Sequence, residues 1–326
     1  MMNLNDTAGK LVGGLQADFP LTEQPYADLG KNLNISEAEV ITIIRQLQDE
    51  GILRQMGAVF DARHLGYRTT LVAMKVAPAR MERAAAVIRE HPGISHGYER
   101  KHDLNLWCTL AARSQAALKA EVERLGEDTG AEVCFSLPAR RLFKLRTYFA
   151  PGNDAPTGTG TSAPEKTTGE TPLSGEDRAV INALQRGLPL ASRPFAPLSA
   201  AAGMDEAAFL ARCRTLLRRG IIRRFSAAVN HRRAGFNANA MTCWVAPPEK
   251  IDAAARQLTA LRQVSHCYER QTNPHWRYNL FAMIHGADRE SCREIADKVS
   301  AETGLEERVV LFSSREIKKT RVPYPV

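Results

Sequence analysis

The sequence predicts an α+β protein built as a tandem duplication, with a helical domain and a sheet domain in each half. A seven-residue motif carries the duplication, since Ile94–Arg100 reads ISHGYER and Val264–Arg270 reads VSHCYER. Flanking segments repeat in the same order, including Gly-Ile-Leu-Arg at 51–54 and Gly-Ile-Ile-Arg at 220–223. We therefore expect two related sites, or one site built from two halves.

Length and composition are those of an ordinary globular protein. The 326 residues suffice for two or more domains, and 25% of them are charged. No apolar run approaches the roughly 18 residues that cross a bilayer, and residues 1–14 lack the basic-then-apolar order of a secretion signal. We expect a cytoplasmic protein with no membrane partner.

The six cysteines are scattered, without a C-x-x-C pair and without matching positions in the two halves. Zinc and iron–sulfur sites need clustered ligands, so the sequence predicts no protein metal site. We expect most of these cysteines to be small, buried, apolar side chains.

Positive charge is concentrated in the second half. Residues 1–150 hold 19 Lys+Arg against 18 Asp+Glu, whereas residues 176–326 hold 24 against 15. Such a surface suits nucleic acid, an acidic partner or a polyanionic small molecule, and charge alone does not choose among them.

A segment rich in Pro, Gly and Thr reads as a flexible linker between the halves. Within each half, helical periodicity gives way to strand patterns. The predicted boundaries are 15–68 and 176–238 for the helical domains, 69–150 and 239–326 for the sheet domains, and 151–175 for the linker.

Each helical domain has the order of a winged helix-turn-helix. Ser36 with Glu39 forms a capping-box pattern before an apolar stripe that ends at Gly51, and Asp205 starts the equivalent helix that ends at Gly220. A short helical stretch precedes each of these helices, and a strand-like run follows each one as the expected wing. The wing runs are 56–60 and 225–229.

Each sheet domain has the order βαββαβ, which predicts a ferredoxin-like fold. The second half repeats this order over 240–312, with a longer connection between its middle strands. The expected elements of the first half are 70–76, 81–90, 94–101, 104–111, 114–128 and 132–137.

A DNA-binding role predicts two like, basic recognition helices. The first-half helix over 36–50 contains four acidic residues and one arginine, whereas the second-half helix carries Arg212, Arg214, Arg218 and Arg219. One acidic and one basic copy do not match two half-sites. We therefore expect no nucleic-acid partner, and a transcription regulator is the alternative.

The repeated motif carries the chemistry. Alternate side chains of a strand share a face, so His96, Tyr98 and Arg100 are expected to point to one face. The residues between them and before them are expected to point to the other face, namely Ser95, Gly97 and Glu99. His and Arg then stand about 13 Å apart, which suits a large flat ligand with several carboxylates. Interface packing would explain one copy of this row, but its retention in two diverged copies favours function. The second copy of the row is His266, Tyr268 and Arg270.

Histidine placement supports the same rows. Among the eight histidines, only His96 and His266 occupy matching positions. Histidines can deliver a proton near neutral pH, which makes this pair the expected proton donors. Most of the unmatched histidines His91, His102, His275 and His285 are expected in solvent.

The helix-turn-helix followed by a ferredoxin-like domain resembles the Lrp/AsnC superfamily. Two motifs together resemble one branch of it, the siroheme decarboxylases in a fused NirD–NirL arrangement. These are Ile-Arg-Arg-Phe with Asn-His-Arg over 222–232, and Ser-His-x-Tyr-Glu-Arg followed by Asn-Leu-Trp at 105–107 or Asn-Leu-Phe at 279–281. The first half departs from the wing motif at Gln55, Met56 and Ala62.

The resemblance implies removal of two acetate carboxyl groups from siroheme as carbon dioxide, giving 12,18-didecarboxysiroheme for heme d1 or an alternative heme. It implies no cofactor beyond the iron of the substrate. The halves are expected to pair as an intramolecular pseudo-dimer, with further homodimerisation open. A regulator that responds to a tetrapyrrole without turnover is a second alternative.

The expected site has proton donors, cations and an apolar wall. The catalytic set is His96, His266, Arg100 and Arg270. The sequence leaves open which half holds the productive site. It also leaves open whether a histidine binds the iron. The expected substrate-binding residues are Tyr98, Tyr268, Arg54, Arg223, Arg224, His231, Arg232, Met56, Phe225, Trp107 and Phe281.

Overall fold

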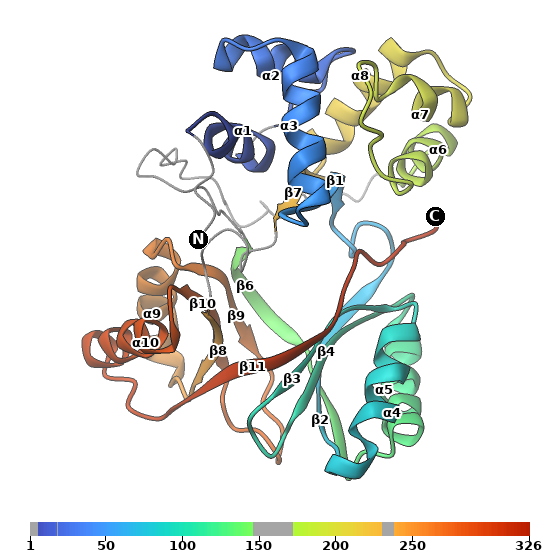
Figure 1. Cartoon of the computed structure of the whole chain (residues 1–326). Helices are drawn as coiled ribbons and strands as arrows, with labels where there is room; N and C mark the ends of the chain where they lie inside the picture. The colour runs from blue at the N-terminus through green and yellow to red at the C-terminus, as the bar shows by residue number, and fades with distance from the viewer. Residues whose placement is uncertain (1–5, 18, 146–171, 230–237) are drawn as a thin grey trace. The chain divides into compact units, whose positions relative to one another are not determined.

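The computed structural model describes residues 6–17, 19–145, 172–229 and 238–326. The chain forms two compact units, and each unit draws on both halves of the sequence (Figure 1). Residues 1–65, 148–235 and 324–326 make up the helical unit, and residues 66–147 and 236–323 make up the sheet unit.

Each half contributes three helices to the helical unit. The predicted capping box at the third helix is confirmed, because Ser36 Oγ accepts from the Glu39 backbone N–H and the Glu39 carboxylate accepts from the Ser36 N–H. The last residues of the predicted linker, Ser174 and Gly175, start a helix instead. The helices are α1 Asp6–Ala17, α2 Pro25–Leu33 and α3 Glu37–Asp49, then α6 Gly175–Leu184, α7 Ala196–Ala201 and α8 Glu206–Arg218.

The two predicted wings form one shared sheet. Strand β1, Leu53–Phe60, pairs antiparallel with β7, Ile222–Val229, of the other half. The register is close to symmetric, since Met56 lies opposite Ala227 and Ala58 lies opposite Phe225. Both predicted wing strands are present, and the sequence analysis made no prediction of their pairing with each other. A lone strand leaves its backbone groups open, and its duplicated copy satisfies them.

The sheet unit confirms the βαββαβ order in both halves. The expected helix over 81–90 is found with those bounds, and the other first-half elements lie within two residues of their expected ends. The second-half order was expected to end at 312, but its last strand continues to Lys319. The first half has β2 Arg68–Lys75, η1 Pro78–Arg80, α4 Met81–Glu90, β3 Ile94–Arg100, β4 Leu106–Ala112, α5 Gln115–Thr129 and β5 Val133–Leu137. The second half has β8 Ala238–Trp244, α9 Pro248–Ala260, β9 Val264–Arg270, β10 Leu280–Gly286, α10 Arg289–Thr303 and β11 Arg308–Lys319.

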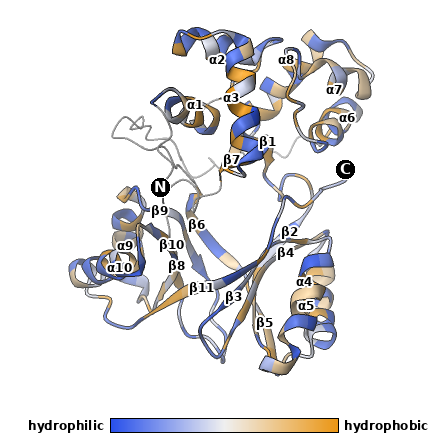
Figure 2. Ribbon diagram, in the orientation of Figure 1, coloured by the Kyte–Doolittle hydropathy of each residue, from blue (hydrophilic) through white to orange (hydrophobic). Residues whose placement is uncertain are grey.

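The halves of the sheet unit exchange strands. Strand β6, Ala139–Leu145, follows β5 and pairs with β9 of the other half. Strand β11 pairs with β8 through Phe312 and then continues along β3 of the first half (Figure 1). Its colour changes from hydrophobic to hydrophilic along this course (Figure 2). The nine-stranded order is β5-β2-β4-β3-β11-β8-β10-β9-β6, an intramolecular pairing of two related half-sheets.

Three apolar cores hold the sheet unit. Helices α4 and α5 pack on one face of the first half-sheet, and α9 and α10 pack on the matching face of the second. We call the opposite faces the inner faces. A third core joins residues of both inner faces, and the long connection of the second half adds Trp276, whose ring lies 5.1 Å from that of Trp107.

Five of the six cysteines are buried, as expected from the sequence. Within the described ranges, no helix has both the length and the apolar character needed to cross a membrane.

Candidate functional site

Each predicted row comes together on an inner face. The rings of His96 and Tyr98 lie 6.4 Å apart, and so do those of His266 and Tyr268. The guanidinium of the following arginine covers the tyrosine ring in both rows, at 5.6 Å for Arg100 and at 4.6 Å for its counterpart Arg270. Both histidines and both tyrosines are partly exposed.

A β-bulge at the serine shapes both rows. The register steps from His96 opposite Thr109 to Ile94 opposite Leu110, so Ser95 is an extra residue in β3. The same step occurs at Ser265 in β9. The prediction that these serines point away from the histidines was wrong, because a bulge breaks strict alternation.

The bulge brings each serine hydroxyl to its neighbouring imidazole. Ser95 Oγ lies 2.9 Å from His96 Nδ1, and Ser265 Oγ lies 2.6 Å from His266 Nδ1. Such a contact at Nδ1 sets the ring orientation and governs which nitrogen carries the proton.

The two row arginines bind across the halves. Arg100 is 3% exposed and donates to the Leu311 backbone oxygen at 2.7 Å, and Arg270 donates to the Leu137 oxygen at 2.8 Å. Burial lowers the pKa of Arg100 to about 10, which is still high enough for this guanidinium to be cationic at neutral pH. Burial also lowers the pKa of Arg270. They tie the exchanged strands, and their contact with substrate carboxylates stays a prediction.

The second half adds a second imidazole. His285 Nε2 lies 2.7 Å from Ser265 Oγ, so this hydroxyl stands between two histidines. Both Ser265 and His285 are buried. Burial, with the nearby charge of Lys319, lowers the pKa of His285 to about 4, and the ring is neutral at pH 7.

The expectation that most unmatched histidines lie in solvent was wrong for His285 and for His91, whose Nε2 lies 3.0 Å from Glu121 Oε2. It holds for His102 and His275, which are exposed. Position 285 matches Ala111 in the first half, so the comparison of the two halves did not predict a site residue there. The available signal was periodicity, because position 285 follows Phe281 and Met283 at alternate positions of β10.

The four predicted wall residues lie in packed cores. Trp107 and Phe281 belong to the inner core between the half-sheets. Met56 and Phe225 are buried in the helical unit, where the Phe225 ring packs edge-on against Phe195. Each is at most 3% exposed. Their contact with a substrate stays a prediction.

The Asn-Leu-Trp and Asn-Leu-Phe motifs have a structural component. The Asn105 amide accepts from the Val76 N–H and donates to the Val76 oxygen, at 2.9 and 2.8 Å. Asn279 makes the same two bonds with Ala246, both at 2.8 Å. Each asparagine therefore fixes the end of a neighbouring strand in its own half.

The predicted cations of the wing belong to the helical unit. Arg223 donates to the Asp61 carboxylate at 2.7 Å, and Arg224 donates to Ser226 Oγ at 3.2 Å. Burial acts to raise the pKa of Asp61, but hydrogen bonds from Arg63 and the charge of Arg223 outweigh it and lower the pKa. Arg54 is exposed. The predicted residues His231 and Arg232 lie outside the described ranges.

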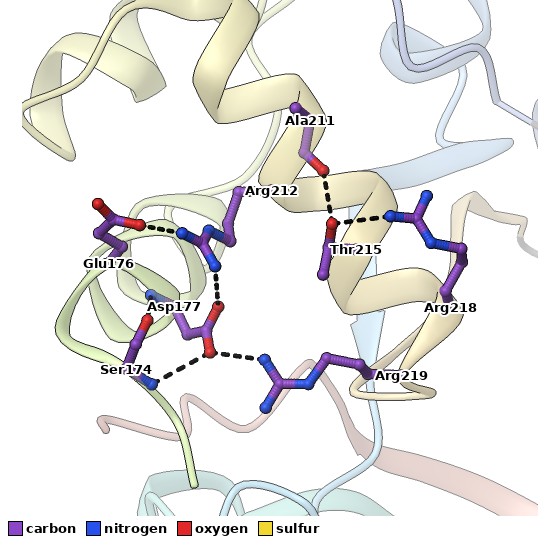
Figure 3. A network of polar contacts seen from close by, with 8 residues as sticks. All are labelled: Ser174, Glu176, Asp177, Ala211, Arg212, Thr215, Arg218 and Arg219. Carbon is purple, nitrogen blue, oxygen red and sulfur yellow. Dashed lines mark hydrogen bonds and ion pairs between the residues drawn. The ribbon is translucent and has the colours of Figure 1, made fainter. Parts of the chain in front are cut away.

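Helix α8 uses its arginines within the helical unit (Figure 3). Arg212 and Arg219 pair with the buried Asp177, and Arg212 also pairs with Glu176. Arg218 donates to Thr215 Oγ1 of the same helix. Arg212 and Arg219 are therefore paired with carboxylates of α6, whereas Arg214 and Arg218 stay exposed.

Two family models match the chain in both halves. A siroheme decarboxylase NirDL-like helix-turn-helix domain matches residues 9–54 and 177–223. An AsnC-like ligand binding domain matches residues 64–144 and 233–318. Together they follow the duplicated order of helical and sheet segments.

Among curated relatives, a siroheme decarboxylase of Hydrogenobacter thermophilus is 36% identical over 97% of this chain and 94% of its own length. A siroheme decarboxylase NirDL subunit of Paracoccus pantotrophus is 34% identical over 96% of both chains. A siroheme decarboxylase beta subunit of Methanosarcina barkeri is 38% identical and matches 45% of this chain with 96% of its own.

Solved structures agree with these relatives. A crystal structure of the siroheme decarboxylase NirDL matches with a TM-score of 0.72 and 34% identity, over 97% of this chain and 94% of that chain. A second one, in complex with an iron-uroporphyrin III analogue, matches with a TM-score of 0.73 and 33% identity, over 98% and 95%.

Proposed function

Because the chain belongs to the siroheme decarboxylase family, we propose that it removes two acetate carboxyl groups from siroheme as carbon dioxide. The product would be 12,18-didecarboxysiroheme, on a route to heme d1 or to an alternative heme. The likeness to a NirDL structure that holds an iron-uroporphyrin III analogue supports a tetrapyrrole substrate.

The chemistry needs a proton donor and no redox partner. Each step adds a proton to a ring carbon and then breaks the bond to the carboxylate, which releases carbon dioxide and leaves an exocyclic methylene. The methylene gains a proton and the ring carbon loses one, which gives the methyl group. No electrons are gained or lost, so the proposal includes no cofactor beyond the iron carried by the substrate. We assign the protons to His96 and His266, which are partly exposed on the inner faces.

The other groups of the rows bind and orient. Tyr98 and Tyr268 are partly exposed beside the histidines and can donate to substrate carboxylates. Arg100 and Arg270 hold these tyrosine rings and supply buried positive charge. The wing cations Arg54, Arg223, Arg224, His231 and Arg232 stay substrate-binding residues predicted from the sequence.

The observation that carries the proposal is the duplicated row itself. Serine bulge, histidine, tyrosine and arginine recur in both halves, although neighbouring positions have diverged to Gly97 against Cys267 and to Ala111 against His285. We infer that the halves act as an intramolecular pseudo-dimer, which matches the strand exchange of the sheet unit.

Anaerobic incubation of the purified chain with siroheme, followed by mass spectrometry, tests the proposal. We expect a product that has lost two carbon dioxide masses. Tight binding of unaltered siroheme would instead favour a tetrapyrrole-responsive regulator. A duplex shift at moderate salt without tetrapyrrole binding would favour an ordinary transcription regulator.

A further inference from the structure

We propose that His285 is a positioning residue for His266, acting through the Ser265 hydroxyl, and that it makes the second-half site differ from the first. This inference rests on the proposed function, since it assigns His266 a proton to deliver. The relay occurs in one half, because the first half has Ala111 at the matching position.

The geometry makes the relay directional. Ser265 Oγ lies 2.6 Å from His266 Nδ1 and 2.7 Å from His285 Nε2. A hydroxyl has one proton, so it donates to one of these nitrogens and accepts from the other. The orientation of Ser265 is therefore coupled to the proton positions of both rings.

The proposed role of His266 as the proton donor selects one direction. His285 is 6% exposed, and a neutral imidazole in this position can accept the Ser265 proton at Nε2. Ser265 Oγ then accepts from His266 Nδ1–H. A protonated His266 can release its other proton, at Nε2, to the substrate and keep Nδ1–H in place. The predicted neutral tautomer of His266 therefore carries its proton on Nδ1.

Groups on the adjacent strands complete the comparison. His266 has Met283 of β10 and Leu145 of β6 as its cross-strand neighbours, whereas Lys144 donates to the Thr259 and Leu261 backbone oxygens. In the first half, His96 has Thr109 and Lys319 as cross-strand neighbours. Each histidine thus contacts the serine before it, but the groups around the two pairs differ.

The relay predicts unequal decarboxylation steps. Removing His285 allows Ser265 to donate to His266 Nδ1. Nδ1 then carries no proton, which disfavours the doubly protonated ring that delivers its Nε2 proton to the substrate. The step that depends on His266 should slow about tenfold, the effect of one lost buried hydrogen bond. The mono-decarboxylated tetrapyrrole should accumulate where His266 serves the second step, and siroheme should persist where His266 serves the first.

The test compares His285→Leu, which fills the space without an acceptor, with His285→Gln, whose amide oxygen can accept from Ser265. His91→Gln is a matched control at a histidine outside the rows. Nitrogen-15 spectra of histidine-labelled protein give the His266 tautomer, and single-turnover reactions with siroheme give the two step rates. Ser265→Ala provides a second break in the relay if His285→Leu fails to fold.

We expect the Nδ1–H tautomer in the wild type, its loss with slowed turnover in His285→Leu and Ser265→Ala, and recovery in His285→Gln. An unchanged His266 tautomer and unchanged step rates in the broken relays would overturn the inference. A wild type that leaves siroheme intact would refute the proposed function instead, and the tautomer comparison would still decide whether the relay exists.

Discussion

The guanidinium of Arg100 donates to the backbone oxygen of Leu311 at 2.7 Å, and this bond joins a strand of the first half to the exchanged strand of the second. Arg270 repeats the arrangement with Leu137. The same arginines cover the tyrosine rings of the rows. Site geometry and the pairing of the halves therefore depend on the same two side chains.

Replacing Arg100 should destabilise the sheet unit. Arg100→Met leaves the buried Leu311 oxygen without this donor, which should cost about 1–3 kcal/mol in the free energy of unfolding. Urea unfolding measures the loss, with Arg140→Met at an exposed position as the control. Equal stability of Arg100→Met and wild type, together with weaker siroheme binding, would assign Arg100 to the substrate alone.

Gly97 is required by the close approach of α4. A Cβ at this position would lie 2.4 Å from Ile88 Cγ2, so Gly97→Ala must push the helix from the strand that carries His96. We expect a loss of about 1–3 kcal/mol in unfolding free energy. The matched change Cys267→Ala removes atoms instead of adding them, and should not displace its helix. A Gly97→Ala variant as stable as wild type would show that this packing is not tight.

Asp177 should give the helical unit an acid-sensitive stability. Burial acts to raise its pKa, but hydrogen bonds from Arg219 and the Ser174 backbone and the charge of Arg212 outweigh it, so the pKa lies below its ordinary 3.8. This contribution is present above pH 3.8 and is lost as the pH falls through the folded pKa.

Asp177→Asn should therefore lose about 1–3 kcal/mol of stability at pH 7, and the difference from wild type should shrink below pH 4. Urea unfolding at several pH values measures this, with exposed Asp49→Asn as the control. A difference that does not change with pH would contradict the ion-pair assignment.

His285 should make the stability of the sheet unit depend on pH between about 4 and 6.5. Its pKa falls from 6.5 in the unfolded chain to about 4 in the fold, so the unfolded chain binds more protons between these values. Wild-type stability should drop as the pH falls from 6.5 to 4, by on the order of 3 kcal/mol. His285→Gln lacks this titration and should lose less. Parallel pH curves for the two proteins would argue against a buried neutral His285.

The repeat made most of the fold predictable. Capping at Ser36 and the strand and helix order of each sheet domain follow from local patterns, and the structure confirms them. Pairing between the halves does not follow from local patterns. Strands β1 and β7, and the exchanged β6 and β11, satisfy their backbone bonds across the duplication, which periodicity within one half cannot reveal.

The candidate site was predictable only in part. Alternation placed His96, Tyr98 and Arg100 together, but it assigned Ser95 to the wrong side because one extra residue shifts the register. Comparison of the two halves did not identify His285, because the first half has Ala111 at the matching position and only shared residues were selected. Burial of Arg100 and Trp107 depends on the inner core, which forms only when both half-sheets meet.

The most direct test of the central claim follows siroheme by mass under anaerobic conditions with wild type, His96→Ala, His266→Ala and the double variant. The account predicts loss of two carbon dioxide masses with wild type, arrest of at least one step in a single variant, and no decarboxylation by the double variant. Full two-step turnover by both single variants and by the double variant would contradict the assignment of these histidines as the proton donors.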